Sequence, residues 1–222
     1  MIEINTESDL SKVDKSTKTV TLNTDLDLSE EFETIKKFTG LFNGNNHTIS
    51  GLTKPFIENV TSEAEVKNVS FENLNISGKQ GAGVIHKLIG TLTNITAIGD
   101  VSNMTITGGI VGFCRGGSIN NSEFIGSAST KKQIHFLHEK KDIATGGIVG
   151  KAVEADINDC TVRGTVRSRT FAGGLAGIME ETKVNNCTSH ATVISNRVAA
   201  GLVSNPKTKN TITNTSVTGV II

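Results

Sequence analysis

Two histidines and an acid, His135, His138 and Glu139, stand close together in the chain. Imidazole and carboxylate groups of this kind bind metal ions or move protons in many enzymes. The order His-x-x-His-Glu, however, differs from the His-Glu-x-x-His order of a zinc-protease helix. We therefore predict no metal site, no cofactor and no catalytic residue here.

The same stretch is rich in lysine and lies within residues 127–145, which lengthen one unit of a repeat described below. Insertions into a repeat protein loop out on one face, and that face often binds a partner. We favour a tolerated surface excursion without a ligand, and the alternative is a loop that binds a partner. The candidate binding residues are Lys131, Lys132, His135, His138, Glu139, Lys140 and Lys141.

Charged pairs at the repeat spacing form a second group of candidates. Glu154 and Glu181 are separated by one repeat, as are Asp156 and Lys183. Paired carboxylates can act as acid and base or hold calcium. Stacked repeats also bring like residues together by geometry alone. We therefore favour a row of surface charges without a catalytic role, in which Lys183 offsets part of the negative charge.

Arginines are concentrated in the last third of the chain, at Arg163, Arg167, Arg169 and Arg197. Such a spread can bind an acidic partner, because the guanidinium group pairs well with carboxylates. It can also consist of solvated side chains without a common role.

Two recurring landmarks show how these residues are positioned. A glycine followed by small apolar residues recurs at 83, 109, 147, 174 and 201, in steps of 26, 38, 27 and 27. An Asn or Asp recurs at 68, 94, 121, 159, 186 and 214, in steps of 26, 27, 38, 27 and 28. One unit of about 27 residues, lengthened once, is the signature of a stacked solenoid.

The residue types that recur at equivalent positions of the repeat predict the local structure. Asn and Asp tolerate left-handed backbone angles and mark sharp bends, while glycine permits tight corners. Alternating aliphatics beside the bends, such as Val162 and Val166, predict short strands whose inward faces form the core. Arg163 and Arg167 should then point outward. Short strands that pair from coil to coil make an all-β parallel β-helix, a single domain of about seven coils.

The ends of the chain differ. Residues 1–30 are predicted to hold an N-terminal cap and the first strand, with a short helix at 6–13 and a strand at 17–22. Residues 31–222 form the β-helix with its insertion. The C-terminal stretch 215–222 is apolar strand without polar cover, which predicts an open edge able to pair end to end.

The segment Phe38–Leu52, which reads FTGLFNGNNHTISGL, and the repeated Gly-Gly-Ile-Val-Gly are the most family-specific features. They resemble the GLUG-repeat β-helices of bacterial and archaeal surface proteins. They are also similar to the β-helical region before the protease domain of M26 immunoglobulin A1 metallopeptidases. The resemblance runs from about residue 17 to 222 and implies a right-handed parallel β-helix. It implies adhesion, scaffolding or substrate presentation, and no M26 catalytic residue is carried over because His-Glu-x-x-His is absent.

Composition narrows the function further. The 222 residues contain 22 basic and 22 acidic side chains, no Trp and no Tyr. The balance of positive and negative charge argues against electrostatic binding of nucleic acid or an anionic membrane. The absence of Trp and Tyr argues against a carbohydrate-cleaving site and against a site on which nucleic-acid bases stack. No apolar run is long enough for a membrane span. We expect a cell-surface or extracellular location if the chain is excised from a larger protein, and a cytoplasmic one if it is complete.

The sequence therefore favours a non-enzymatic binding or display module of an adhesin, an appendage or a larger secreted protein, with a protein or glycan as ligand. One alternative is a structural protomer that stacks end to end through residues 215–222. The other is a glycan-processing β-helix enzyme, which would need a groove with carboxylates and a cation in register.

Overall fold

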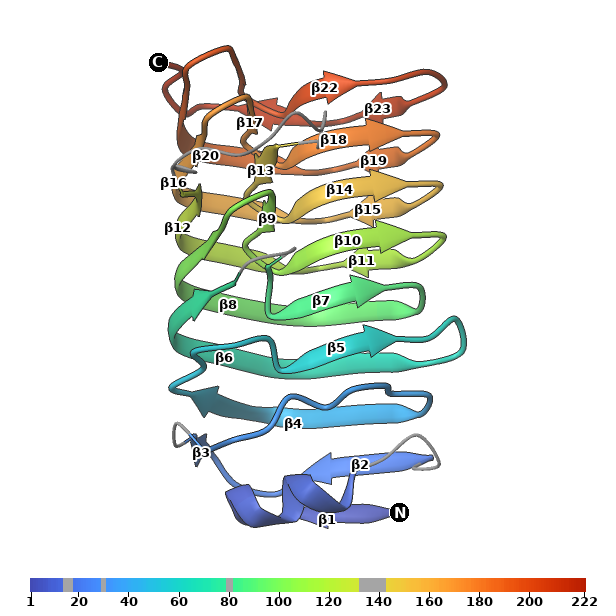
Figure 1. Ribbon diagram of the computed structural model, residues 1–222. Helices are drawn as coiled ribbons and strands as arrows, with labels where there is room; N and C mark the ends of the chain where they lie inside the picture. The colour runs from blue at the N-terminus through green and yellow to red at the C-terminus, as the bar shows by residue number, and fades with distance from the viewer. Residues whose placement is uncertain (14–17, 29–30, 79–81, 132–142) are drawn as a thin grey trace.

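The computed structural model describes residues 1–13, 18–28, 31–78, 82–131 and 143–222. The described chain winds into a column of coils with its two termini at opposite ends (Figure 1). Every strand pair is parallel, and the strands form three sheets of 14, six and four strands, named here sheets A, B and C. This arrangement is that of an all-β parallel β-helix.

The main path of sheet A contains β1 (Ile2–Ile4), β2 (Thr19–Leu22), β4 (Leu41–Ser50), β6 (Glu65–Ser77), β8 (Thr91–Asn103), β11 (Ser118–Asn120), β15 (Asp156–Asn158), β19 (Lys183–Asn185) and β23 (Thr211–Thr213). Its remaining strands are β3 (Leu26–Asp27), β12 (Glu123–Thr130), β16 (Thr161–Ser168), β20 (Thr188–Ser195) and β24 (Ser216–Val217). Sheet B contains β5 (Ile57–Val60), β7 (Ile85–Leu88), β10 (Val111–Arg115), β14 (Val149–Val153), β18 (Ala176–Glu180) and β22 (Val203–Pro206). Sheet C contains β9 (Ile106–Gly108), β13 (Ala144–Gly146), β17 (Phe171–Gly173) and β21 (Val198–Ala200).

The strand register confirms the repeat read from the sequence. Gly108 pairs with Gly146, Gly146 with Gly173, and Gly173 with Ala200, which reproduces one lengthened step followed by two ordinary ones. The register shifts in the lower part of sheet A, between β6 and β8, where Leu74 instead of Asn73 faces Gly99. Asn73 has a left-handed φ of 51°, which is typical of the extra residue in a bulge.

The Asn and Asp landmarks are the predicted bends. A positive φ is found at each of Asn68, Asn94, Asn121, Asp159, Asn186 and Asn214. Their side chains also connect neighbouring coils: Asn94 Nδ2 donates to Asn68 Oδ1 at 3.0 Å, and Asn68 Nδ2 donates to Asn43 Oδ1 at 3.2 Å. Asn therefore supplies both the left-handed backbone angle and the coil-to-coil amide bond.

The second glycine of each Gly-Gly pair lies directly against the core. A Cβ atom on Gly147 would lie 2.3 Å from Val162 Cγ1, and one on Gly109 would lie 2.4 Å from the Phe124 ring. These distances are shorter than any real contact, so only glycine lets sheet A side chains reach this wall of the column. Packing of the core thus explains why this glycine recurs.

The inward and outward positions of β16 agree with the sequence. Val162 and Val166 are fully buried, whereas Arg163 and Arg167 are exposed. In the N-terminal coils, larger phenylalanine rings fill the core, with Phe56 5.4 Å from Phe42 and 5.3 Å from Phe71 between ring centroids. The core is therefore one continuous file of side chains along the column.

The N-terminal end differs from the expectation for residues 1–30. A strand, β1, precedes the helix and pairs with β2, so the strand expected at 17–22 is the second one and is described from Thr19. Residues 7–12 form a 3₁₀ helix, η1, in which Leu10 is buried. Lys12 and the backbone N–H groups of Asn5 and Thr6 bond to Asp9, and these contacts hold the pKa of Asp9 well below its usual range.

Candidate functional site

The structure places both ends of residues 127–145, which were predicted to form an inserted loop, in strands. Residues 127–130 belong to β12, and Ala144 and Thr145 belong to β13. Lys131 is described and exposed. The other predicted binding residues, which are Lys132, His135, His138, Glu139, Lys140 and Lys141, lie outside the described residues.

The residues on either side of the insertion are hydrogen-bonded to neighbouring coils. The Lys131 N–H donates to Asn103 O at 2.6 Å, which extends the pairing of β12 with β8 by one residue. After the insertion, the Phe171 N–H donates to Ile143 O at 3.2 Å. Lys131 and Ile143, which flank the insertion, therefore both lie at one corner of the column, between sheets A and C.

The four arginines do not share one environment. Arg163 Nε lies 2.8 Å from Glu123 Oε1, on the coil below, and this ion pair is partly exposed. Arg167, Arg169 and Arg197 are exposed, and the described part of the chain places no carboxylate within ion-pair distance of them. Arg163 is thus paired with Glu123, while the other three have no ion-pair partner among the described residues.

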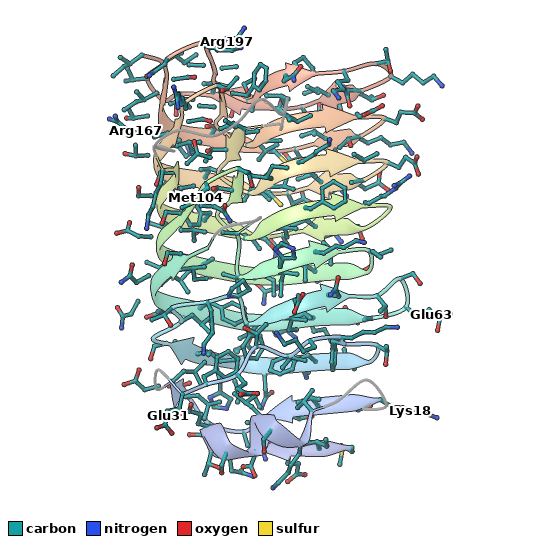
Figure 2. All side chains as sticks on the ribbon, in the orientation of Figure 1. Lys18, Glu31, Glu63, Met104, Arg167 and Arg197 are labelled. Atoms are coloured by element: carbon teal, nitrogen blue, oxygen red, sulfur yellow. The ribbon has the colours of Figure 1, made fainter. Side chains whose placement is uncertain are left out.

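Those three arginines lie on the two coils that stack above the coil of Lys131. Arg167 extends from β16, opposite Ser129 of β12, and the Arg169 N–H donates to Thr130 Oγ1 at 3.2 Å. The Arg197 N–H donates to Ser195 Oγ at 3.2 Å, and Ser195 pairs with Ser168, the residue before Arg169. In Figure 2, Arg167 lies at the left edge of the upper coils and Arg197 lies at the top of the column. We name this surface, formed by Lys131, Arg167, Arg169 and Arg197, the basic corner.

A column of small polar residues supports the basic corner from inside. Asn103, Thr130, Ser168 and Ser195 occupy successive coils in register, and the first three are buried. Thr130 Oγ1 and Ser168 Oγ are 3.2 Å apart, and Ser195 Oγ donates to Thr170 O at 3.1 Å. This column was missed in the sequence, although its members all stand at the same offset from the Gly or Ala of their coils, at 99, 126, 164 and 191.

The carboxylate candidates lie at the opposite end of the sheet A strands. Asp156 pairs with Lys183 in register, as expected. Glu154 and Glu181 both have left-handed φ, of 52° and 49°, and Glu181 forms a 3.7 Å ion pair with Lys209. These contacts describe a surface ladder of mixed charge.

A groove of about 960 Å³ lies at the N-terminal end, between η1 and residues 31–37. Its floor includes the buried side chains of Leu10, Val13, Phe32 and Ile35. Its rim carries charges of both signs, from Glu31, Glu33, Lys36 and Lys37 among others. It lies far along the column from the basic corner (Figure 1).

The described residues contain no group of three or more His, Cys, Asp or Glu side chains suited to a metal ion. None of their helices has the length and hydropathy needed to cross a membrane.

The cysteines are buried thiols. Cys160 and Cys187 stack on successive coils, with Cys160 N 3.4 Å from Cys187 Sγ, and both are free. The hydrogen bond to Cys187, together with burial, raises the pKa of Cys160, and burial raises the pKa of Cys114 to about 12. A raised pKa keeps the Cys160 and Cys114 thiols protonated and unreactive, so they act as small core residues.

Known proteins resemble this chain in fold and in sequence. A putative immunoglobulin A1 protease from Bacteroides ovatus superposes with a TM-score of 0.77 at 17% identity, over 99% of this chain and 76% of that one. A structure titled IgA1 Protease superposes with a TM-score of 0.74 at 21% identity, over 98% of this chain and 20% of that one. At these identities the superpositions establish the fold alone.

Sequence similarity extends to a very large protein. Halomucin of Haloquadratum walsbyi is 30% identical over an alignment of 138 positions, which covers 50% of this chain and 2% of halomucin. Residues 142–167 match the GLUG motif, and residues 16–108 match the M26 IgA1-specific metallo-endopeptidase N-terminal region. These matches confirm the resemblance seen in the sequence, both to the GLUG motif and to the M26 N-terminal region.

Proposed function

We propose that this chain is a non-enzymatic binding or display module of a larger cell-surface or secreted protein. In this proposal, a single right-handed β-helix of about seven coils serves as a rigid support, with η1 as the cap of its N-terminal end. The insertion at 132–142 and the corner from which it departs form the binding surface, and the ligand is a protein or a glycan.

One observation carries the proposal: the column continues without a break on both sides of the insertion. β12 pairs with both β8 and β16 along its length, and β13 pairs with both β9 and β17. The strands on both sides of the insertion keep the register of the neighbouring coils, and segments that join such strands are where binding residues are usually found. The relatives support a modular role, because the chain corresponds to 2% of halomucin and 20% of the IgA1 protease chain.

The first test removes the insertion. Deleting positions 132–142 and joining Lys131 to Ile143 shortens the long step from 38 to 27, the ordinary coil length. The deletion keeps the Thr130–Ser168 contact. We expect the variant to fold and to melt within about 3 °C of the parent, measured by circular dichroism, because loops outside the register contribute little to stability.

The binding half of the test uses a printed array of peptides and glycans, probed with biotinylated parent and deletion variant. If the proposal is correct, some peptides or glycans on the array bind the parent and do not bind the deletion variant. Equal retention of both proteins would remove the insertion as the binding surface. Cleavage of any array glycan by the parent would support the enzyme alternative instead.

A second candidate function, end-to-end stacking, is favoured by the last coil. Apart from Met1, the exposed large apolar side chains of the described residues all fall after residue 197: Val198, Ile212, Val217, Val220, Ile221 and Ile222. The Ile222 N–H bonds to Val193 O, so the final residues still follow the sheet. Their outer edge offers unpaired backbone groups to another strand.

Mass measurement by light scattering over a concentration series tests this candidate. If the chain stacks, its mass should rise with concentration, and the double variant Val220→Lys, Ile221→Lys should stay monomeric because charge on an edge blocks strand pairing. A parent that remains monomeric at every concentration removes the stacking protomer.

A further inference from the structure

The basic corner concentrates positive charge on a chain whose overall charge is zero. Lys131, Arg169 and Arg197 come from three successive coils, although they are widely separated in the sequence. Coils stack roughly 4.8 Å apart, so these three backbones lie within roughly 10 Å along the column. Arg167 adds a fourth charge from the outward face of β16.

The corner is also held in place. The backbone N–H groups of Lys131, Arg169 and Arg197 all donate to the polar column, to Asn103, Thr130 and Ser195 respectively. Because the backbone at each cation is hydrogen-bonded, only side-chain freedom is lost when the guanidinium groups engage a ligand. Preorganised groups of this kind bind more tightly than the same charges on a loose loop.

We propose that the basic corner binds a carboxylate-rich polypeptide segment, in an extended conformation along the column axis. The proposal rests on the function proposed above and names the class of partner. Guanidinium groups form paired hydrogen bonds with carboxylates, which distinguishes such a site from a diffuse positive potential.

Charge and composition favour a peptide over other polyanions. Four cations match a short run of Asp or Glu, whereas nucleic acid is held by larger basic surfaces and by aromatic side chains on which bases stack. The chain has no Trp or Tyr, and Phe171, the phenylalanine nearest the corner in sequence, is partly buried in β17. An extended peptide places alternate side chains about 6.8 Å apart, a spacing that arginine side chains on neighbouring coils can follow.

The experiment measures fluorescence anisotropy of a labelled poly-glutamate peptide with the full chain at low ionic strength. We expect saturable binding that weakens as salt is added. The triple variant Arg167→Gln, Arg169→Gln, Arg197→Gln should bind about tenfold more weakly, the sum expected for three exposed ion pairs. Replacing the same arginines with Lys should restore part of the affinity, since charge is kept and the paired geometry is lost.

A matched control removes three cations elsewhere, with Lys18→Gln, Lys37→Gln and Arg115→Gln. These side chains are exposed, and the change in net charge is identical. The control should bind poly-glutamate like the parent. Absence of binding by the parent, or equal weakening in both triple variants, would overturn the proposal.

Two further probes test the ligand class. The first probe compares poly-glutamate with a sulfated dextran and a single-stranded oligonucleotide. If either of these binds more tightly through the same arginines, the ligand is a polyanion of that class and not a carboxylate-rich peptide. If poly-glutamate fails while the array still distinguishes parent from the 132–142 deletion, the partner class is wrong and the binding module stands. If the array fails and poly-glutamate binds through the arginines, the corner acts without the insertion.

Discussion

Val162→Asp is expected to lower the free energy of unfolding by more than about 4 kcal/mol, because a carboxylate would be buried without a partner. Val162 is fully buried, and it packs against Gly147 on the facing wall. For a chain of this size, such a loss corresponds to a fall of about 10 °C or more in Tm. Thermal unfolding followed by circular dichroism measures it.

Thr165→Asp is the matched control, since it places the same charge on the same strand. Thr165 faces outward between Ser127 and Thr192 and is partly exposed. Its variant should melt within about 2 °C of the parent, as surface substitutions usually do. A Val162→Asp protein with the parent Tm would show that the inward register of β16 is wrong.

Gly164→Ala is the second substitution with a large expected effect, a loss of at least about 3 kcal/mol. The backbone of Gly164 has a φ of +111°, and an added Cβ would lie 2.1 Å from the carbonyl oxygen of Gly126 on the coil below. The clash is with backbone, so no side-chain rotation relieves it. Denaturant unfolding at constant temperature would measure the difference in stability.

The next coil supplies the control for this prediction. Ala191 occupies the same column, pairs with Gly164 and has no positive φ. Ala191→Gly should therefore cost only about 0.5–1 kcal/mol, the entropic penalty of glycine in a strand. Equal losses from the two substitutions would mean that steric contact between coils does not set the glycine preference here.

The residue types that each coil repeats were enough to predict much of this fold. The Asn bends, the Gly-Gly corners and the inward valines each follow from local physical requirements, and their regular recurrence stacks them. The polar column behind the basic corner carried the same signal, at a constant offset from the glycines. Ser189, in contrast, is a core position where neighbouring coils have Val162 and Val217, and its buried hydroxyl has no hydrogen-bond partner among the described residues. The hydropathy of serine gives no indication that Ser189 occupies an inward position that holds valine in β16 and β24.

The sequence by itself determined the repeat. Residue types that recur periodically produce a backbone that repeats periodically, because each coil needs the same bends, corners and inward-facing apolar side chains. Only the tertiary structure decided which residues meet between coils. Lys131 and Arg169 stand on either side of the insertion, and the sequence placed them in separate candidates, a loop and a scattered set of arginines. The stacking of β12 on β16 brings them to one corner, pairs Arg163 with Glu123 and leaves Arg167 without an ion-pair partner among the described residues. Such contacts depend on how the coils wind and align in space, and no single coil contains that information.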